Sequence, residues 1–111
     1  MLSAEYDITL DAGADYDTRL TIKDDNGDFL DLSDFVARMK IKHKFISTSS
    51  YDCSDYLTIS NDGIIDINLP ASLTVQLRFN DGVYDLEIEN TNGNIYKIIR
   101  GRIFVNKEVT D

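Results

Sequence analysis

The chain has little of the chemistry on which most enzymes and metal sites depend. Its 111 residues contain one histidine and one cysteine, and tryptophan is absent. These are too few ligands for the usual structural zinc sites. A Ser–His–Asp or Cys–His site would have to use His43, and neither Cys53 nor any serine has the spacing of a nucleophile elbow. We therefore expect no enzymatic activity, no catalytic residues and no cofactor.

Prolines, paired cysteines and long apolar runs are also scarce. The only proline, Pro70, argues against a disordered or linker-rich chain. The single cysteine excludes an intrachain disulfide and suggests assembly in a reducing cytosol. No segment approaches the roughly 18 apolar residues of a membrane span, and the start "MLSAEYDITL" lacks the features of a signal peptide. We expect a folded protein without a membrane partner.

Acidic residues outnumber basic ones, and the two kinds are unevenly distributed. The net charge is −9, from 20 acidic and 11 basic residues, so anionic membranes and nucleic acid are disfavoured as partners. Residues 1–34 hold ten acidic side chains, whereas Arg38, Lys40 and Lys42 alternate along one basic segment. This segment could pair head to tail with the acidic part of a second copy. The simpler interpretation is a solvated strand face.

Segments that alternate apolar and polar residues make up most of the chain. In residues 16–23, for example, Tyr16, Leu20 and Ile22 fall on one side, as in a half-solvated strand. Turn signals that contain Asn and Gly, at residues 26–27, 61–63 and 92–93, separate such segments and favour hairpins. Only "ASLTVQL" (residues 71–77) could form a helical turn, and it is short. The sequence predicts one domain, residues 1–111, folded as an all-β antiparallel sandwich of seven to eight strands with one short helical turn.

The segment "NDGVYDL" gives this prediction more detail. Gly82, Tyr84 and Leu86 follow the F-strand pattern of immunoglobulin-like sandwiches, with leucine in place of cysteine. In that pattern Tyr84 is a tyrosine corner, whose hydroxyl we expect to bond the backbone near residues 77–80. Gly101, inside the last strand pattern, predicts a bulge or a close approach of another backbone. The expected fold is therefore immunoglobulin-like.

Two kinds of ligand remain open on the residues alone. The Asp-rich segments "DAGADYD" and "DDNGD" could supply oxygen ligands to calcium, but they lack the EF-hand spacing and also fit ordinary turns. Tyr51 and Tyr56 could form an aromatic platform for a glycan, although such tyrosines more often cover the edge of a sandwich. We favour the structural interpretation in both cases.

Three long stretches resemble a known group of proteins. They are "TRLTIKDDNGDFLDLSDFVARMKI", "NDGIIDINLP" and "GVYDLEIENTNGNIYKIIRGRIFVNKEVT", within residues 5–110. The pattern resembles the small Ig-like β-sandwich structural proteins of tailed bacteriophages, which include collar, tail-fibre attachment and baseplate components. The resemblance is most specific at "GVYDLEI" and at "RGRIFVNKEVT", with Gly101. It implies no catalytic residues.

The resemblance implies a virion protein that assembles in the host bacterial cytoplasm. Its partners would be other phage virion proteins and further copies of itself in a ring, at the neck, tail or baseplate. Arg38, Lys40, Lys42, Tyr51 and Tyr56 are the candidate contact residues. The alternatives are a host-receptor or glycan-binding module and a capsid decoration protein.

Overall fold

A computed structural model describes residues 4–43, 50–77 and 81–107 of the chain. The strands are β1 (Ala4–Glu5), β2 (Ile8–Asp11), β3 (Tyr16–Thr21), β4 (Phe35–His43), β5 (Ser50–Asp52), β6 (Leu57–Ser60), β7 (Ile64–Leu69), β8 (Asp81–Asn90) and β9 (Ile95–Asn106). Two short helices complete the set, a 3-10 turn η1 (Ser54–Tyr56) and α1 (Ala71–Thr74). The described residues thus form nine strands, more than the seven to eight expected, and the expectation of an almost all-β chain is confirmed.

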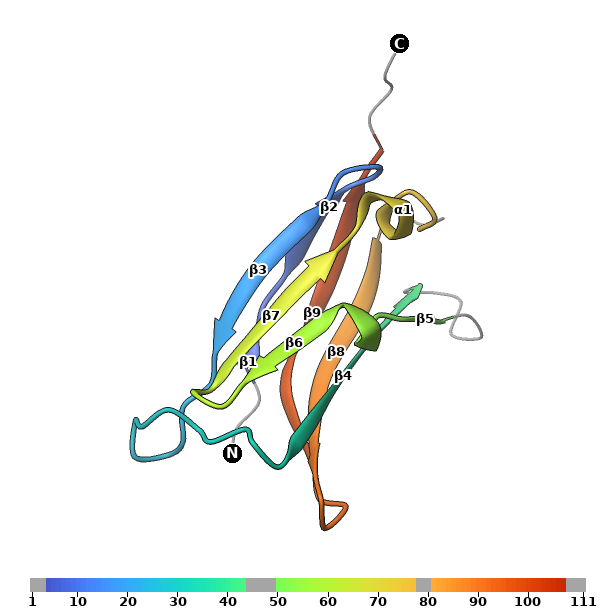
Figure 1. The fold of residues 1–111 in the computed structure, drawn as a ribbon. Coiled ribbons are helices and arrows are strands. Elements are labelled where there is room, and N and C mark those ends of the chain that lie inside the picture. The colour runs from blue at the N-terminus through green and yellow to red at the C-terminus, as the bar shows by residue number, and fades with distance from the viewer. Residues whose placement is uncertain (1–3, 44–49, 78–80, 108–111) are drawn as a thin grey trace.

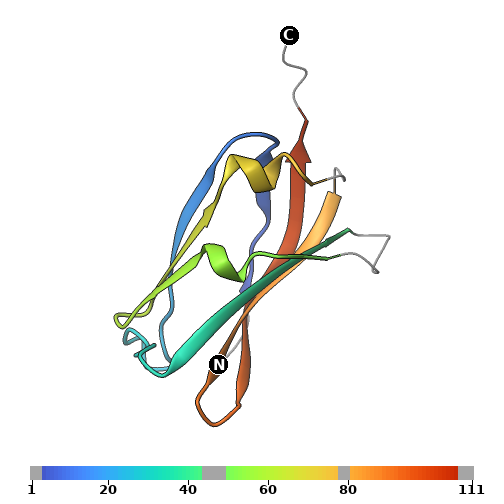
Figure 2. The same ribbon diagram turned by 45° about the vertical axis from the view of Figure 1, so that its right-hand side comes forward.

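The strands form two sheets that face each other (Figures 1 and 2). The large sheet has the order β1-β9-β8-β4-β5, with β2 also paired to β9. The small sheet has the order β3-β7-β6. Figure 2 shows the two layers separated along their length, with α1 and η1 on the side of the small sheet.

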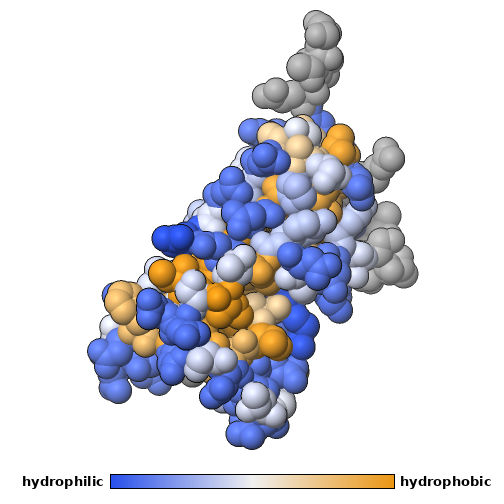
Figure 3. Space-filling model, viewed as in Figure 1, coloured by the Kyte–Doolittle hydropathy of each residue, from blue (hydrophilic) through white to orange (hydrophobic). Residues whose placement is uncertain are grey.

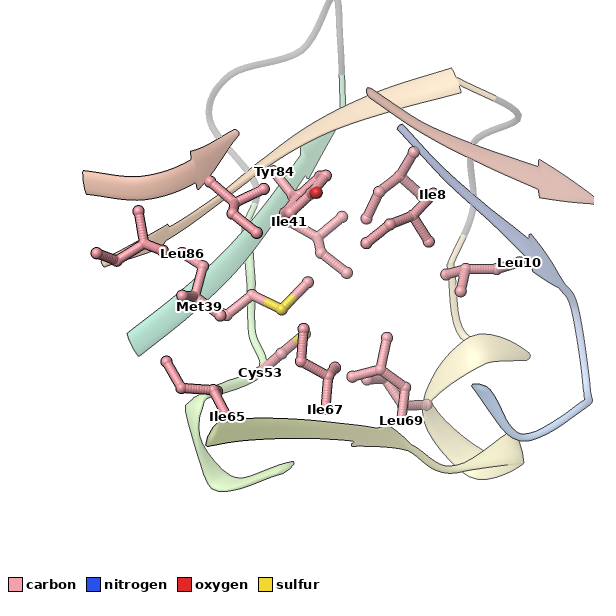
Figure 4. Packing of buried hydrophobic residues seen from close by; sticks show 14 of the residues in the cluster. Ile8, Leu10, Met39, Ile41, Cys53, Ile65, Ile67, Leu69, Tyr84 and Leu86 are labelled. Atoms are coloured by element: carbon pink, nitrogen blue, oxygen red, sulfur yellow. The ribbon is translucent and has the colours of Figure 1, made fainter. Parts of the chain in front are cut away.

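The hydrophobic core fills the space between the sheets. Met39, Ile41 and Leu86 of the large sheet are fully buried, and they point toward Ile65 and Leu69 of the small sheet (Figure 4). Burying each such side chain stabilises the fold by roughly 1.5–3 kcal/mol. The alternation seen in the sequence places these residues inward, because successive side chains of a strand point to opposite faces.

Two of the three hairpins expected from turn residues are present. Gly63 connects β6 to β7 and Gly93 connects β8 to β9, with φ of +81° and +87°. The Asn26–Gly27 turn differs, because the segments on its two sides pair only at an isolated bridge between Lys23 and Phe29. Beyond this bridge the chain crosses from β3 in the small sheet to β4 in the large sheet, so the pairing does not extend into a hairpin of two strands.

The prediction of a wholly antiparallel fold is wrong at the N-terminus. Strands β1 and β2 run parallel to β9 and keep one register along it, with Ala4 opposite Ile99 and Ile8 opposite Ile103. The pairing is interrupted only at Tyr6 and Asp7. Parallel pairing of distant segments leaves no turn signal, so the sequence could not reveal it.

The expected helical turn is confirmed at α1. The Asp15 carboxylate accepts a hydrogen bond of 2.7 Å from the N–H of Ala71, at the start of the helix. Leu73 and Leu77 are both buried, as their spacing suggested. The segment therefore closes one end of the core.

Candidate interaction surfaces

The predicted tyrosine corner is replaced by a contact with the N-terminal segment. Tyr84 is buried with its hydroxyl 2.6 Å from the main-chain oxygen of Tyr6, to which it donates a hydrogen bond. The predicted acceptor near residues 77–80 is therefore wrong, and residues 78–80 lie outside the described part. Burial raises the pKa of the Tyr84 hydroxyl, and the nearby Tyr16 and Tyr6 side chains raise it further. The hydroxyl thus stays protonated and acts as a donor.

Gly101 makes room for the same carbonyl. A Cβ atom at this position would lie 2.1 Å from the Tyr6 oxygen. Gly101 stands directly opposite Tyr84 in the β8–β9 pairing, and the Asp7 carboxylate accepts a hydrogen bond of 3.0 Å from the N–H of Arg102. The close approach expected at Gly101 is confirmed. The bulge lies three residues earlier, at Ile98, where the register shifts between Leu86 and Glu87.

The outer face of the large sheet carries stripes of opposite charge. β4 presents Arg38, Lys40 and Lys42, and β8 presents Asp85 and Glu87 beside them. On the other side of β8, β9 presents Lys97, Arg100 and Arg102. Glu5 on β1 lies beside Arg100, and Asp52 on β5 lies beside Lys40. Basic and acidic strands therefore alternate across the whole sheet.

The central part of this face is held by a chain of ion pairs. The two oxygens of Glu87 bind Arg38 of β4 at 3.1 Å and Lys97 of β9 at 2.7 Å. Arg38 also contacts Glu89, and Lys97 contacts Asp85 at 3.3 Å. Lys97 and Arg38 lower the pKa of the Glu87 carboxyl, Lys97 having the larger effect. Arg38 is therefore engaged within its own sheet, which leaves it less able to contact a second copy.

An open hollow on this face extends from the ion pairs to the other basic residues. It has a volume of about 830 Å³, and Val83 lines it together with six basic and four acidic side chains, a local excess of two positive charges. We call the part formed by Lys40, Lys42, Val83, Arg100 and Arg102 the basic hollow. Within the described residues, Lys40, Lys42 and Arg102 form no ion pair. The pair between Arg100 and Glu5, at 3.7 Å, is exposed and stabilises little.

The structure does not bring Tyr51 and Tyr56 onto this face. Tyr51 lies opposite Ile41, and its side chain packs against the core with its hydroxyl 3.3 Å from the carbonyl oxygen of Gln76. Tyr56, in η1, also packs against the core. Both side chains are half-buried, so they fit the edge-covering role better than an exposed platform for a sugar.

The Asp-rich segments act as turns in the structure. The Asp24 carboxylate accepts hydrogen bonds from the N–H groups of Asn26 and Asp28, at 2.9 and 3.0 Å. Asp31 likewise accepts from Ser33, and this bond lowers the pKa of its carboxyl. In the described part of the chain, no three acidic, histidine or cysteine residues are grouped to hold a metal ion.

A smaller hollow lies between the loop that follows β3 and the strands β4 and β9. Leu30, Phe35 and Tyr96 line a space of about 240 Å³ beside Asp24 and Asp25. Figure 3 shows hydrophobic side chains gathered below β6, while the rest of this side is mostly hydrophilic. The hollow is small, and it carries no group of convergent charges.

The sequence reasoning missed the β9 half of the charged face. Arg100 and Arg102 are two residues apart and so share a face, but their position beside Val83 depends on the β8–β9 register. The bulge at Ile98 hides that register, because it places Ile98 and Ile99 both inside and breaks the alternation. Only the strand pairing reveals the complete surface.

Comparison of the chain with models of known protein families and with curated proteins gives no match. Among the described residues, no helix has the length and apolar character needed to cross a membrane.

Proposed function

We propose that the chain is a structural protein of a tailed bacteriophage particle. It assembles through protein–protein contacts into the neck, tail or baseplate, in a collar or tail-fibre attachment role. Its partners are other virion proteins and further copies of itself in a ring. The support for the virion setting is the resemblance of the three sequence stretches described above.

The single structural observation that carries a binding role is the charged outer face of the large sheet. Six of the 11 basic residues of a chain with net charge −9 line one hollow on this face. The acidic surface elsewhere keeps the subunit soluble and repels nonspecific partners of the same charge. A surface of this kind orients a protein partner by charge, and complementary charges are one means of orienting the heterologous contacts of a ring.

We also propose that the fold is immunoglobulin-like. The order β2-β9-β8-β4-β5 against β3-β7-β6 matches the division of an immunoglobulin sandwich into a sheet with strands G, F and C and a sheet with strands B, E and D. The burial of Tyr84 and Leu86 on β8 supports the proposal, because the F-strand pattern expects both side chains to point into the core. The acceptor of the Tyr84 hydroxyl departs from the tyrosine corner.

Protein mass spectrometry of density-purified particles tests the virion role. The expected result is that the protein is present at a fixed number of copies per major capsid protein and resists a salt wash. Recovery of the protein only in the soluble fraction of the lysate would refute the proposal. A soluble host enzyme serves as the control for contamination.

A host-receptor or glycan-binding role has less support from the structure, because Tyr51 and Tyr56 pack against the core. A capsid decoration role differs from the favoured role only in where the protein sits on the particle. The same purified particles distinguish the two roles, because a decoration protein remains on heads that lack tails.

A further inference from the structure

The loop between β3 and β4 carries the features complementary to the basic hollow. Asp25, Asp28 and Asp31 are exposed on it. Between them Phe29 has the largest exposed fraction of any large hydrophobic side chain in the described part of the chain, 61%. We call residues 24–34 the acidic loop. Its exposed Phe29 lies among these carboxylates in the chain, and the Lys23 Nζ lies over one side of the ring, 5.4 Å from its centroid.

The basic hollow offers the opposite arrangement. Val83, 40% exposed, lies between Lys42 and Arg102 in one row across the sheet, because Lys42 pairs with Val83 and Val83 with Arg102. Val83 is therefore an exposed apolar side chain with a basic side chain on each side of it. It belongs to the hollow of about 830 Å³ whose whole lining has two more basic than acidic side chains, a volume within the range of roughly 300–1,000 Å³ typical of binding pockets.

The acidic loop cannot reach the basic hollow of its own chain. It ends beside Phe35, the first residue of β4, and Lys42 lies seven residues further along that strand, roughly 23 Å at about 3.3 Å per residue. A hydrogen bond from the Leu30 N–H to the oxygen of Ile22, the residue after β3, ties the loop to the end of that strand, and one from the Asp24 N–H to the Asp28 oxygen closes the loop on itself. In Figure 1 the loop lies at the lower left, whereas β4 ends on the right at about mid-height.

We propose that the basic hollow binds the acidic loop of a second copy of this chain, with Phe29 on Val83 and with Asp25 and Asp28 beside Lys42 and Arg102. The two surfaces differ, so the contact is heterologous and leaves one loop and one hollow available for further copies. Such contacts close into a ring or extend as a filament. This inference rests on the proposed function, since it supplies the self-contact of a ring subunit.

Sedimentation velocity of the full chain tests the contact. The wild type is expected to self-associate at about 50 mM salt and to dissociate at about 500 mM, where screening acts over a few ångströms. The variant Lys42→Glu/Arg102→Glu, whose hollow then has four basic against six acidic side chains and whose loop is acidic, is expected to be monomeric. So is the variant Asp25→Lys/Asp28→Lys/Asp31→Lys, in which the hollow stays basic and the loop has three basic against two acidic side chains.

The decisive measurement is an equimolar mixture of these two variants. Each hollow then meets a loop of opposite charge, so the mixture should recover association although neither variant associates alone. Recovery also proves that both variants are folded. The controls are Lys107→Glu and Asp55→Lys. Each makes the same type of charge reversal at a single exposed position outside both surfaces, and each should associate like the wild type. Phe29→Ser should weaken association at least about tenfold without a change in charge.

A wild type that stays monomeric at low salt, or a mixture that remains monomeric, overturns the proposed contact. Neither result bears on whether the protein is present in purified particles. Conversely, recovered association in the mixture, with the protein missing from particles, supports the contact and refutes the virion role.

Discussion

The hydroxyl of Tyr84 donates a hydrogen bond of 2.6 Å to the main-chain carbonyl of Tyr6, 78 residues away in the sequence. This bond ties β8 to the point where the N-terminal segment changes from β1 to β2. Ile8 and Leu10, just beyond it, are buried in the core. The N-terminal segment is therefore a structural part of the domain, positioned by one tyrosine and one glycine.

The variant Tyr84→Phe is expected to lower the free energy of unfolding by about 1 kcal/mol, because the part-buried hydrogen bond from the Tyr84 hydroxyl to the Tyr6 carbonyl is lost. Urea unfolding followed by circular dichroism measures the change. The variant Tyr51→Phe is the control, since the acceptor of Tyr51 is exposed and water can replace the lost bond. An equal effect of both substitutions would contradict the role of the Tyr84 bond.

The variant Gly101→Ala is expected to destabilise the protein by about 1–3 kcal/mol, because its Cβ would overlap the Tyr6 carbonyl, 2.1 Å away. The displaced carbonyl can no longer accept from Tyr84. In the Gly101→Ala background, Tyr84→Phe should therefore have a smaller effect than in the wild type. A double-mutant cycle measures this coupling, and strictly additive free energies would show that the two residues act independently.

The ion pairs of Glu87 predict how stability depends on pH. Lys97 and Arg38 lower the pKa of Glu87 in the folded state, so this carboxylate stabilises the fold above its unfolded pKa of about 4.3. That contribution is lost as pH falls through the lowered native value. Lys97→Met should reduce stability at pH 7, and its difference from the wild type should shrink below about pH 4. Lys107→Met, at an exposed lysine, should show no such change, and a pH-independent difference for Lys97→Met would contradict the prediction.

Cys53 is buried, and this burial raises the pKa of its thiol to about 12. At pH 8 the folded thiol should react with a disulfide reagent roughly a thousandfold more slowly than in the unfolded chain, where its pKa is about 8.5. Thiol titration with and without denaturant measures the ratio. Equal rates in the two conditions would mean that the segment of β5 and η1 around Cys53 opens readily in the native state.

Local patterns predicted those features of the fold that depend on neighbouring residues. The inward sides of β7 and β8, the turns at Gly63 and Gly93 and the helical turn α1 all follow from alternation and turn chemistry. Features that depend on distant pairing did not follow. The acceptor of Tyr84, the parallel position of β1 and β2, and the partner of Arg38 each require a register between segments that are far apart in the chain.

The candidate surface was predicted only in part for the same reason. Arg38, Lys40 and Lys42 do share one face, as their spacing indicated. Arg38 is neutralised by β8, however, while Arg100 and Arg102 join Lys40 and Lys42 from β9. Period-two spacing identifies the side of a strand, but strand order determines which charges become neighbours.

A cryo-electron map of the assembled phage particle tests the virion role most directly. We expect several copies of this two-sheet domain in a ring at the neck, tail or baseplate, with the outer face of the large sheet turned toward a neighbouring subunit. A map in which every neck, tail and baseplate subunit is accounted for by other chains would contradict the proposed function.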